Sequence, residues 1–103
     1  MYYIWIMSKE EPTFNFSADK NSLLIRERNI SFEEIIAAIE DGNVLAIVEH
    51  PNKKKFGHQK MYIVHADDYV YLVPFVEERG GKIFLTIIPS RKAKKQYLDK
   101  EEN

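Results

Sequence analysis

The sequence predicts one α+β domain with two N-terminal helices, a four-stranded, mainly antiparallel sheet and a C-terminal helix. Three observations predict this class. The first part of the chain contains helix caps and a strongly amphipathic segment, and the second part contains runs of β-branched and aromatic residues between turn residues. The chain has 103 residues, of which 45% are hydrophobic. That length supports one hydrophobic core and is too short for two domains of ordinary size.

The first predicted helix covers residues 17–28 and has Leu23 and Leu24 on its inner side. Asn29 follows this segment, and asparagine tolerates the left-handed conformation in which many helices end. We therefore expect a short helix that stops before the next start signal.

The second predicted helix covers residues 32–41 and begins with a capping box. Ser31 stands at the N-cap position and Glu34 three residues later, so each side chain is placed to bind a free backbone amide of the other. Gly42 ends the segment. The apolar residues that recur at i, i+3, i+4 and i+7, on one helix face, are Phe32, Ile35, Ile36 and Ile39.

The strands follow in the second half of the chain. Asp67-Asp68 predicts a tight hairpin, and residues 78–81 predict a looser one. Pro74 lies inside the third strand, which predicts an edge position or a bulge because proline cannot donate a backbone hydrogen bond. Ser90 is predicted to cap a last helix over residues 91–99. The four predicted strands are residues 44–49, 60–66, 69–76 and 83–88.

Residues 1–13 are predicted to form a leader or a peripheral strand, and residues 14–103 the domain itself. The apolar residues 2–7 have no basic segment before them and no small-residue cleavage site after them, and Met7 is an equally good start. No apolar run approaches the ~20 residues that span a bilayer. The chain has no cysteine, which is usual in a reducing compartment. We therefore expect a cytoplasmic protein with no membrane segment.

The formal net charge is −1, from 15 basic and 16 acidic side chains, and such a total argues against a nucleic-acid partner. The charges are segregated along the chain, however. Residues 1–49 hold nine acids and four bases, a balance of −5, whereas residues 50–98 hold four acids and ten bases, a balance of +6. The last five residues hold three acids and one base. The second half of the domain is therefore basic enough to contact phosphates.

The first basic candidate is the connector of residues 51–60, which holds four lysines and no acid. A lysine run in a loop is most often only a solvated surface. Phe56 adds an aromatic ring to this run, and Gly57 allows the backbone to approach a ligand closely. His58 titrates near neutrality and is a candidate acid or base. The lysines are Lys53, Lys54, Lys55 and Lys60.

The second basic candidate is the final helix, whose first turns carry the cations and whose end carries the acids. This order opposes the helix dipole and costs some stability. A helix N-terminus with added cations also suits a phosphate, because free amides, dipole and side-chain charge act together. The cations of this segment are Arg91, Lys92, Lys94 and Lys95.

A metal site is not expected. His50, His58 and His65 are separated by eight and seven residues, and these spacings match none of the usual ligand motifs. A histidine within a strand, such as His65, is more often a hydrogen-bonded structural residue. The sequence also contains no glycine-rich phosphate loop and no nucleophile elbow, so we expect no cofactor.

Several motifs resemble those of the BrnT family of bacterial type II toxins, over about residues 14–97. The matching segments are Phe14-Asn15-Phe16 with Lys20, then Ile30-Ser31-Phe32-Glu33-Glu34, then Glu78-Arg79-Gly80, and finally Ile87-Ile88-Pro89-Ser90-Arg91-Lys92-Ala93. Three positions depart from the family pattern. Arg28 stands where the family has a histidine, Lys60 where it has an arginine, and Pro89 where it has a serine.

This resemblance implies a RelE-like fold and a metal-independent endoribonuclease that blocks translation by cutting RNA, free or on the ribosome. It also implies a ribbon-helix-helix antitoxin as partner. The protein would bind operator DNA only in complex with this antitoxin. The implied phosphate-stabilising residues are Arg91 and Lys60, with Arg79 assisting, and the proton-transfer group is His58 or else Tyr97. The residues expected to hold RNA phosphates are Arg28, Lys53, Lys54, Lys55, Lys92, Lys94 and Lys95.

Two other functions stay open at this stage. Because Arg28 replaces the family histidine, the chain is also compatible with a non-catalytic binding module of the same fold. The third alternative is a small structural domain whose lysines only keep it in solution.

Overall fold

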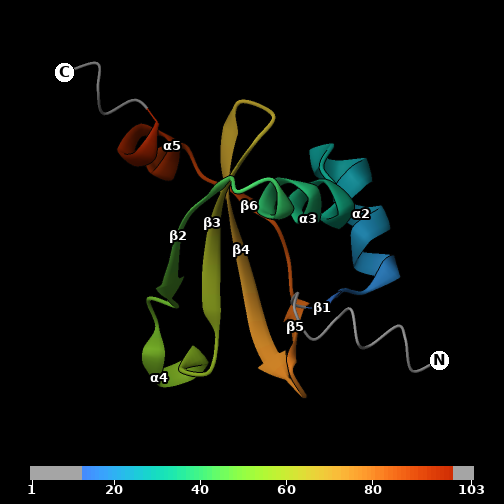
Figure 1. Ribbon diagram of the computed structural model, residues 1–103, viewed down its shortest axis with the longest axis vertical. Coiled ribbons are helices and arrows are strands. Elements are labelled where there is room, and N and C mark those ends of the chain that lie inside the picture. The colour runs from blue at the N-terminus through green and yellow to red at the C-terminus, as the bar shows by residue number, and fades with distance from the viewer. Residues whose placement is uncertain (1–12, 99–103) are drawn as a thin grey trace.

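Two capped helices follow a short first strand in the computed structural model, which describes residues 13–98 (Figure 1). Helix α2 (Ala18–Arg28) begins after Ser17, whose hydroxyl accepts from the amide of Lys20, and it ends at Asn29 with φ of 58°. This confirms the predicted stop at Asn29, whereas Ser17, predicted as the first helical residue, is the N-cap.

Helix α3 (Phe32–Glu40) confirms the predicted capping box. The Ser31 hydroxyl accepts from the Glu34 amide at 3.1 Å, and the Glu34 carboxylate accepts from the Ser31 amide at 2.9 Å. Two amides of the first turn, which have no partner within a helix, are satisfied in this way. The buried side chains of α3 are Phe32, Ile35 and Ala38.

The sheet that follows is mixed. Its strands lie in the order β1–β5–β4–β3–β2, with β6 beside β4; β1 is parallel to β5, and every other pairing is antiparallel. The edge strands of this order are β1 and β2. The strand bounds are β1 Thr13–Asn15, β2 Val44–Glu49, β3 Lys60–Ala66, β4 Tyr69–Glu78, β5 Gly81–Phe84 and β6 Ile88–Pro89.

The α+β class is confirmed, but the described chain has three elements more than predicted: β1, α4 and one strand from the division of the predicted strand of residues 83–88. Within residues 13–98 there are six strands and four helices. A single turn of helix, α4 (Lys53–Phe56), lies in the connector that was expected to be a loop. The predicted strand of residues 83–88 is divided into β5 and β6, and the last helix, α5, covers Arg91–Tyr97. The prediction for residues 1–12 lies outside the described residues.

Pro74 explains the divided strand. The prediction of an edge position was wrong, because β4 lies between β3 and β5 in the sheet. The Pro74 carbonyl accepts from the Leu85 amide, so the backbone of Pro74 is directed towards the strand that follows β5. In such an antiparallel pair the first residue also donates its N–H to the carbonyl of the second, and Pro74 has no N–H to donate. The β4–β5 pairing therefore stops at Phe75 and Phe84, and the chain pairs again with β4 only at Ile88.

Both hairpins are tight two-residue turns with left-handed backbone. Asp67 and Asp68 have φ of 53° and 59°, and Arg79 and Gly80 have φ of 52° and 82°. Two consecutive residues of positive φ are typical of the type I′ turns that match the twist of paired strands. The second hairpin is therefore as tight as the first, and the expectation of a looser one was wrong.

The sheet is covered on both faces. Helices α2 and α3 pack on one face, where Phe32 and Ile35 meet Val64 and Phe75 in the larger core cluster. Helix α5 lies on the other face, where Ala93 joins the smaller cluster around Ile63 and Val70. Figure 1 shows α2 and α3 beside the right-hand part of the sheet and α5 beside the upper end of β2. Residues from the two faces alternate along β3, as the pleat of a strand requires.

A buried asparagine joins the two N-terminal helices. Asn21 is only 9% exposed; its amide nitrogen donates to the Glu33 carboxylate at 2.8 Å, and its amide oxygen accepts from the Phe32 backbone N–H at 2.7 Å. The hydrogen bond from Asn21 is the main reason why the pKa of Glu33 lies below its ordinary value of 4.5.

This lowered pKa predicts a pH dependence of stability. A carboxyl group whose pKa is lower in the folded state stabilises the fold above its unfolded pKa, and that contribution is lost as the pH falls through the folded pKa. We expect Glu33→Gln to unfold with a weaker pH dependence than the wild type below about pH 4.5. Urea titrations between pH 3 and pH 7 measure this difference. Glu40→Gln, at the exposed end of the same helix, serves as the control, and identical pH profiles for wild type and Glu33→Gln contradict the prediction.

Candidate functional site

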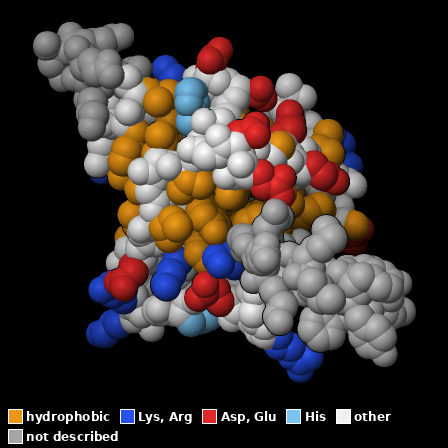
Figure 2. All heavy atoms as spheres, viewed as in Figure 1, with side chains coloured by type: hydrophobic (Ala, Val, Ile, Leu, Met, Phe, Trp, Pro, Cys, Tyr) orange, Lys and Arg blue, Asp and Glu red, His pale blue; other side chains and the backbone are white. Residues whose placement is uncertain are grey.

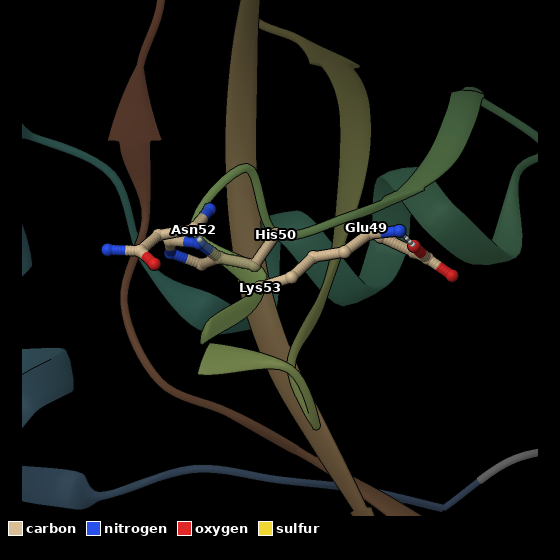
Figure 3. A network of polar contacts seen from close by, with 4 residues as sticks. All are labelled: Glu49, His50, Asn52 and Lys53. Carbon is tan, nitrogen blue, oxygen red and sulfur yellow. Dashed lines mark hydrogen bonds and ion pairs between the residues drawn. The ribbon is translucent and has the colours of Figure 1, made fainter. Parts of the chain in front are cut away.

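The basic connector is held in a defined shape by its own polar contacts (Figure 3). Asn52 caps α4, because its side-chain oxygen accepts from the Lys55 amide at 3.2 Å. The Asn52 amide in turn donates to Nδ1 of His50 at 3.1 Å, so Nδ1 is an acceptor and the proton of neutral His50 is on Nε2. The three lysines of α4 therefore extend from a capped turn at the end of the sheet.

One acid lies among these lysines, and it is already paired. Nζ of Lys53 lies 2.6 Å from the Glu49 carboxylate, and Figure 3 shows the Lys53 side chain reaching back to Glu49. This contact lowers the pKa of Glu49, with a smaller contribution from the charge of Lys60, and it raises the pKa of Lys53. Both side chains are exposed, so the pair adds little stability. Glu49 therefore removes about one positive charge from this end of the sheet.

Lys60 begins β3 at the same end of the sheet. It lies opposite Glu49 of β2 and opposite Phe75 of β4, and the exposed His58 is two positions before it in the chain. Two of the predicted catalytic residues, His58 and Lys60, are therefore near each other and near α4.

The β4–β5 turn adds two cations on the neighbouring strands. Arg79 occupies the turn itself. Lys82, which the sequence analysis did not single out, lies 3.4 Å from the Glu77 carboxylate and has its Nζ 6.0 Å from the centre of the Phe75 ring. The acid-free stretch that begins at Arg79 is the sequence signal that would have included Lys82. Glu77 and Glu78 reduce the positive charge of this turn.

Helix α5 places its cations on the outside. Ser90 caps the helix by accepting from the Ala93 amide at 3.0 Å, which confirms the predicted cap. Ala93 and Tyr97 face the sheet, whereas Arg91, Lys92 and Lys95 are exposed. Nζ of Lys94 lies 6.0 Å from the centre of the Tyr69 ring. Tyr97 is half-buried in this packing.

The structure does not bring the two main predicted catalytic cations together. The Ser90 amide, just before Arg91, donates to the Val70 carbonyl, and Val70 pairs with His65. His65 and Lys60 are five residues apart on one strand, which at 3.2–3.4 Å per residue separates their backbones by about 17 Å. Arg91 and Lys60 are therefore at different ends of β3.

Arg28 has an intramolecular partner. Its guanidinium donates to the backbone carbonyl of Ile87, in the segment between β5 and β6. This bond ties the last turn of α2 to a buried part of the chain 59 residues later. Arg28 thus lies on the helical side of the molecule, apart from the lysines of α4 and α5.

The lysines of α4 and α5 lie along one side of the molecule. Helix α4 follows β2 in the chain, and α5 lies on the face of the sheet where Leu45, Ala46 and Val48 of β2 pack against the cluster that includes Ala93. Figure 1 accordingly shows α4 at the lower end and α5 at the upper end of β2. The acids gather elsewhere. In Figure 2 most of the red side chains lie at the upper right, over the helices and the β3–β4 turn, while most of the blue side chains lie along the lower rim, with some red side chains among them.

The acidic side contains a hollow of about 470 Å³ between α3 and the β3–β4 turn. Its charged lining comes from Glu34, Asp41, Asp67 and Asp68, with His65 beside them. None of the predicted site residues lies there. In the part of the chain that the structure describes, no group of three or more histidine and carboxylate side chains is arranged to hold a metal ion.

The comparisons with known proteins add no relative. No protein-family model, no curated protein and no solved structure matches this chain. None of the helices within residues 13–98 has the length and apolar character needed to cross a membrane.

Proposed function

We propose that this chain binds RNA and cleaves it without a metal, as the toxin of a type II toxin–antitoxin pair with a RelE-like fold. The observation that carries the proposal is the location of two basic segments, α4 and α5, at the two ends of one edge strand. They are separated by more than thirty residues in the sequence, yet they lie on one side of the folded chain. The motifs that resemble the BrnT family include α5 and the capping box of α3.

RNA binding requires only the side chains on this surface. Lysine and arginine that contact phosphates release condensed counterions, so the affinity falls steeply as the salt concentration rises. The net charge of −1 does not prevent this binding, because the acids gather on the helical side. It does reduce long-range attraction, so we expect weak binding to free RNA and stronger binding where the RNA is presented by the ribosome.

Cleavage is assigned to the α4 end of the surface. Attack by a ribose 2′-hydroxyl requires a base for that hydroxyl, a cation for the charge that develops on the phosphate, and an acid for the leaving oxygen. In this proposal His58 exchanges protons and Lys60 stabilises the phosphate, with Arg79 on the next hairpin. Arg91 holds a phosphate about 17 Å away, outside the reacting group.

This assignment predicts different effects of two alanine variants. Lys60→Ala removes a cation from the transition state and is expected to lower kcat by about 10²–10³. Arg91→Ala removes a distant phosphate contact and is expected to raise KM with little change in kcat. The readout is the appearance of new RNA ends when the purified chain is incubated with mRNA, with and without ribosomes.

Growth of cells that express the chain provides a second readout. The double variant Lys60→Ala/Arg91→Ala is expected to permit growth, and Lys20→Ala/Arg26→Ala, which removes two cations from α2, is expected to inhibit growth like the wild type. Growth arrest by a folded Lys60→Ala/Arg91→Ala chain contradicts the assignment of these two residues.

The second candidate function is a non-catalytic RNA-binding module. The separation of Lys60 from Arg91 favours it, because the two strongest predicted phosphate contacts do not surround one reacting group. Salt-sensitive RNA binding without new RNA ends, on ribosomes and off them, is the result that selects this function.

The partner proposed with the toxin is a small ribbon-helix-helix antitoxin in the cytoplasm. Its co-expression is expected to restore growth, and the pair is expected to bind operator DNA where the toxin alone does not. Growth arrest that persists in the presence of the antitoxin from the neighbouring gene argues against the toxin proposal.

A further inference from the structure

We infer that two copies of this chain pair through the outer edge of β2, as antiparallel strands related by a two-fold axis beside Ile47. The inference goes beyond the proposed function and does not rest on RNA binding. Strand β2 lies at one end of the sheet, next to β3, and Figure 1 shows it as the outermost strand on the left. Within residues 13–98 no strand pairs with its other side.

The backbone of β2 presents a donor and an acceptor to this open edge. The His50 amide donates to the Gln59 carbonyl at 3.2 Å, in the same register as the β2–β3 pairs before it. Bonded and non-bonded residue pairs alternate in an antiparallel ladder, so Val48 and Ala46 bond to β3, whereas Ile47 directs its N–H and C=O away from β3. Ile47 of one copy, placed opposite Ile47 of a second copy, therefore exchanges two backbone hydrogen bonds with it.

The side chains of β2 also favour a second strand. Ile47 pairs with Tyr62, on the sheet face that carries α2 and α3, and is 55% exposed. Ala46 and Val48 are on the opposite face and are only partly buried. Natural edge strands are often protected by lysine or proline, and neither occurs in β2. The bulge of β2 lies between Val44 and Ala46, so the half of the strand around Ile47 is regular.

The charges at the two ends of β2 favour a second copy as the occupant of this edge. The exposed acids Glu40 and Asp41 precede the strand, and the exposed lysines Lys54 and Lys55 follow it. Antiparallel pairing places the end of one β2 beside the beginning of the other. The lysines of each copy therefore lie near the acids of the other, and the two-fold axis makes this contact twice. Opposite charges in this arrangement favour both the partner and the antiparallel orientation.

Sedimentation equilibrium of the full chain over a series of concentrations measures the association. The mass of the wild type is expected to rise from 12.2 kDa towards twice that value. Ile47→Lys places two ammonium groups opposite each other across the axis and is expected to weaken the dimer by about tenfold or more. Ile25→Lys makes the same change in net charge at a 48% exposed position on α2, and it is expected to leave the association unchanged.

Cysteine cross-linking tests the register, because the chain has no cysteine of its own. Two residues that form a bonded antiparallel pair have Cα atoms about 5.5 Å apart, which is within the range of a disulfide. Ile47→Cys is therefore expected to form a covalent dimer under mild oxidation. Ile25→Cys, equally open to the oxidant, is expected to remain monomeric.

Charge reversal tests the contacts at the two ends of β2. Lys54→Glu/Lys55→Glu and Glu40→Lys/Asp41→Lys are each expected to weaken the dimer on the order of tenfold, because each places like charges together. The chain with all four reversals has the net charge of the wild type and again joins opposite charges. It is expected to recover the association of the wild type.

Three outcomes would overturn the pairing. The first is a wild type that keeps a mass of 12.2 kDa up to about 1 mM. The second is a dimer that neither Ile47→Lys nor the charge reversals weaken, because such a dimer uses another surface. The third is a covalent dimer that forms as readily from Ile25→Cys as from Ile47→Cys.

RNA and the second copy compete for one end of β2, because Lys54 and Lys55 are also proposed to contact RNA. The association is measured without RNA, so a failure of the pairing leaves the proposed RNA binding intact. A chain that dimerises through β2 but binds no RNA contradicts the proposed function alone.

Discussion

Phe32→Ala is expected to lower the free energy of unfolding by about 3–5 kcal/mol, which is the range for phenylalanine truncation in a core. The Phe32 side chain is fully buried, and its ring stacks on Phe16 at 4.9 Å and on Phe84 at 6.0 Å between ring centres. It therefore joins α3 to the segment before α2 and to β5. Small domains have a total stability of about 5–15 kcal/mol, so the loss is a large fraction of it.

Urea denaturation of the purified chain measures this loss as a shift in the transition midpoint at constant slope. The capping box does not involve the Phe32 side chain, so helix initiation at Ser31 stays intact in the variant. Phe32→Leu retains most of the volume and is expected to cost clearly less. Ile25→Ala, on the exposed side of α2, is expected to change stability by about 0.5 kcal/mol or less. Equal effects of Phe32→Ala and Ile25→Ala contradict the described core.

Asn21→Ala is expected to destabilise the fold by about 1–3 kcal/mol, the cost of leaving a buried donor without an acceptor. The donor that loses its acceptor in this variant is the Phe32 N–H. It belongs to the first turn of α3, where amides have no partner within the helix, and the Asn21 oxygen accepts from it at 2.7 Å. Ser22→Ala, the next residue on the exposed side of α2, is the matched control and is expected to have almost no effect.

Asn21→Asp separates the two hydrogen bonds of Asn21. The aspartate oxygen still accepts from the Phe32 N–H, but at neutral pH it brings a second negative charge close to the Glu33 carboxylate, where the amide now donates at 2.8 Å. Two carboxylates in contact share a proton more readily than separate ones, so the pKa of one of them rises. The variant is expected to approach wild-type stability as the pH falls. A destabilisation of Asn21→Asp that does not change with pH argues against this arrangement.

Local features that depend on neighbouring residues were predicted well. The caps at Ser31 and Ser90 and the left-handed Asn29 follow from short hydrogen bonds between residues three or four apart, so their pattern is visible in the sequence. The tight turn at Asp67 and Asp68 belongs to the same group. Each of these features is formed by residues that are close together in the sequence, so it needs no tertiary contact.

Features that depend on strand order were predicted poorly. The sequence shows that Pro74 cannot donate a hydrogen bond, but whether this produces an edge, a bulge or a break depends on which strand lies next to it. The structure places β5 there, and the consequence is the division of the predicted fourth strand. The parallel pairing of β1 with β5 joins segments about seventy residues apart, and nothing local in Thr13–Asn15 indicates it.

The candidate site shows the same difference between local features, which were predicted, and long-range features, which were not. The two lysine-rich segments were identified from composition, whereas their location at the two ends of β2 depends on how α5 packs on the sheet. Arg28 was expected to contact RNA, yet it donates to the Ile87 carbonyl across the fold. Lys82 was not singled out, although it belongs to the acid-free stretch that begins at Arg79.

The sequence by itself determined the fold class, the approximate bounds of α2 and α3 and the segregation of charge between the two halves of the chain, because each of these depends on local periodicity or composition. The tertiary structure alone decided which charges share a surface. It separated Lys60 from Arg91 along β3, tied Arg28 to the opposite side of the molecule and placed α4 and α5 along β2. The physical reason is that strand order and helix packing are set by burial of apolar side chains from distant segments, and the exposed charges are carried to wherever that burial places them.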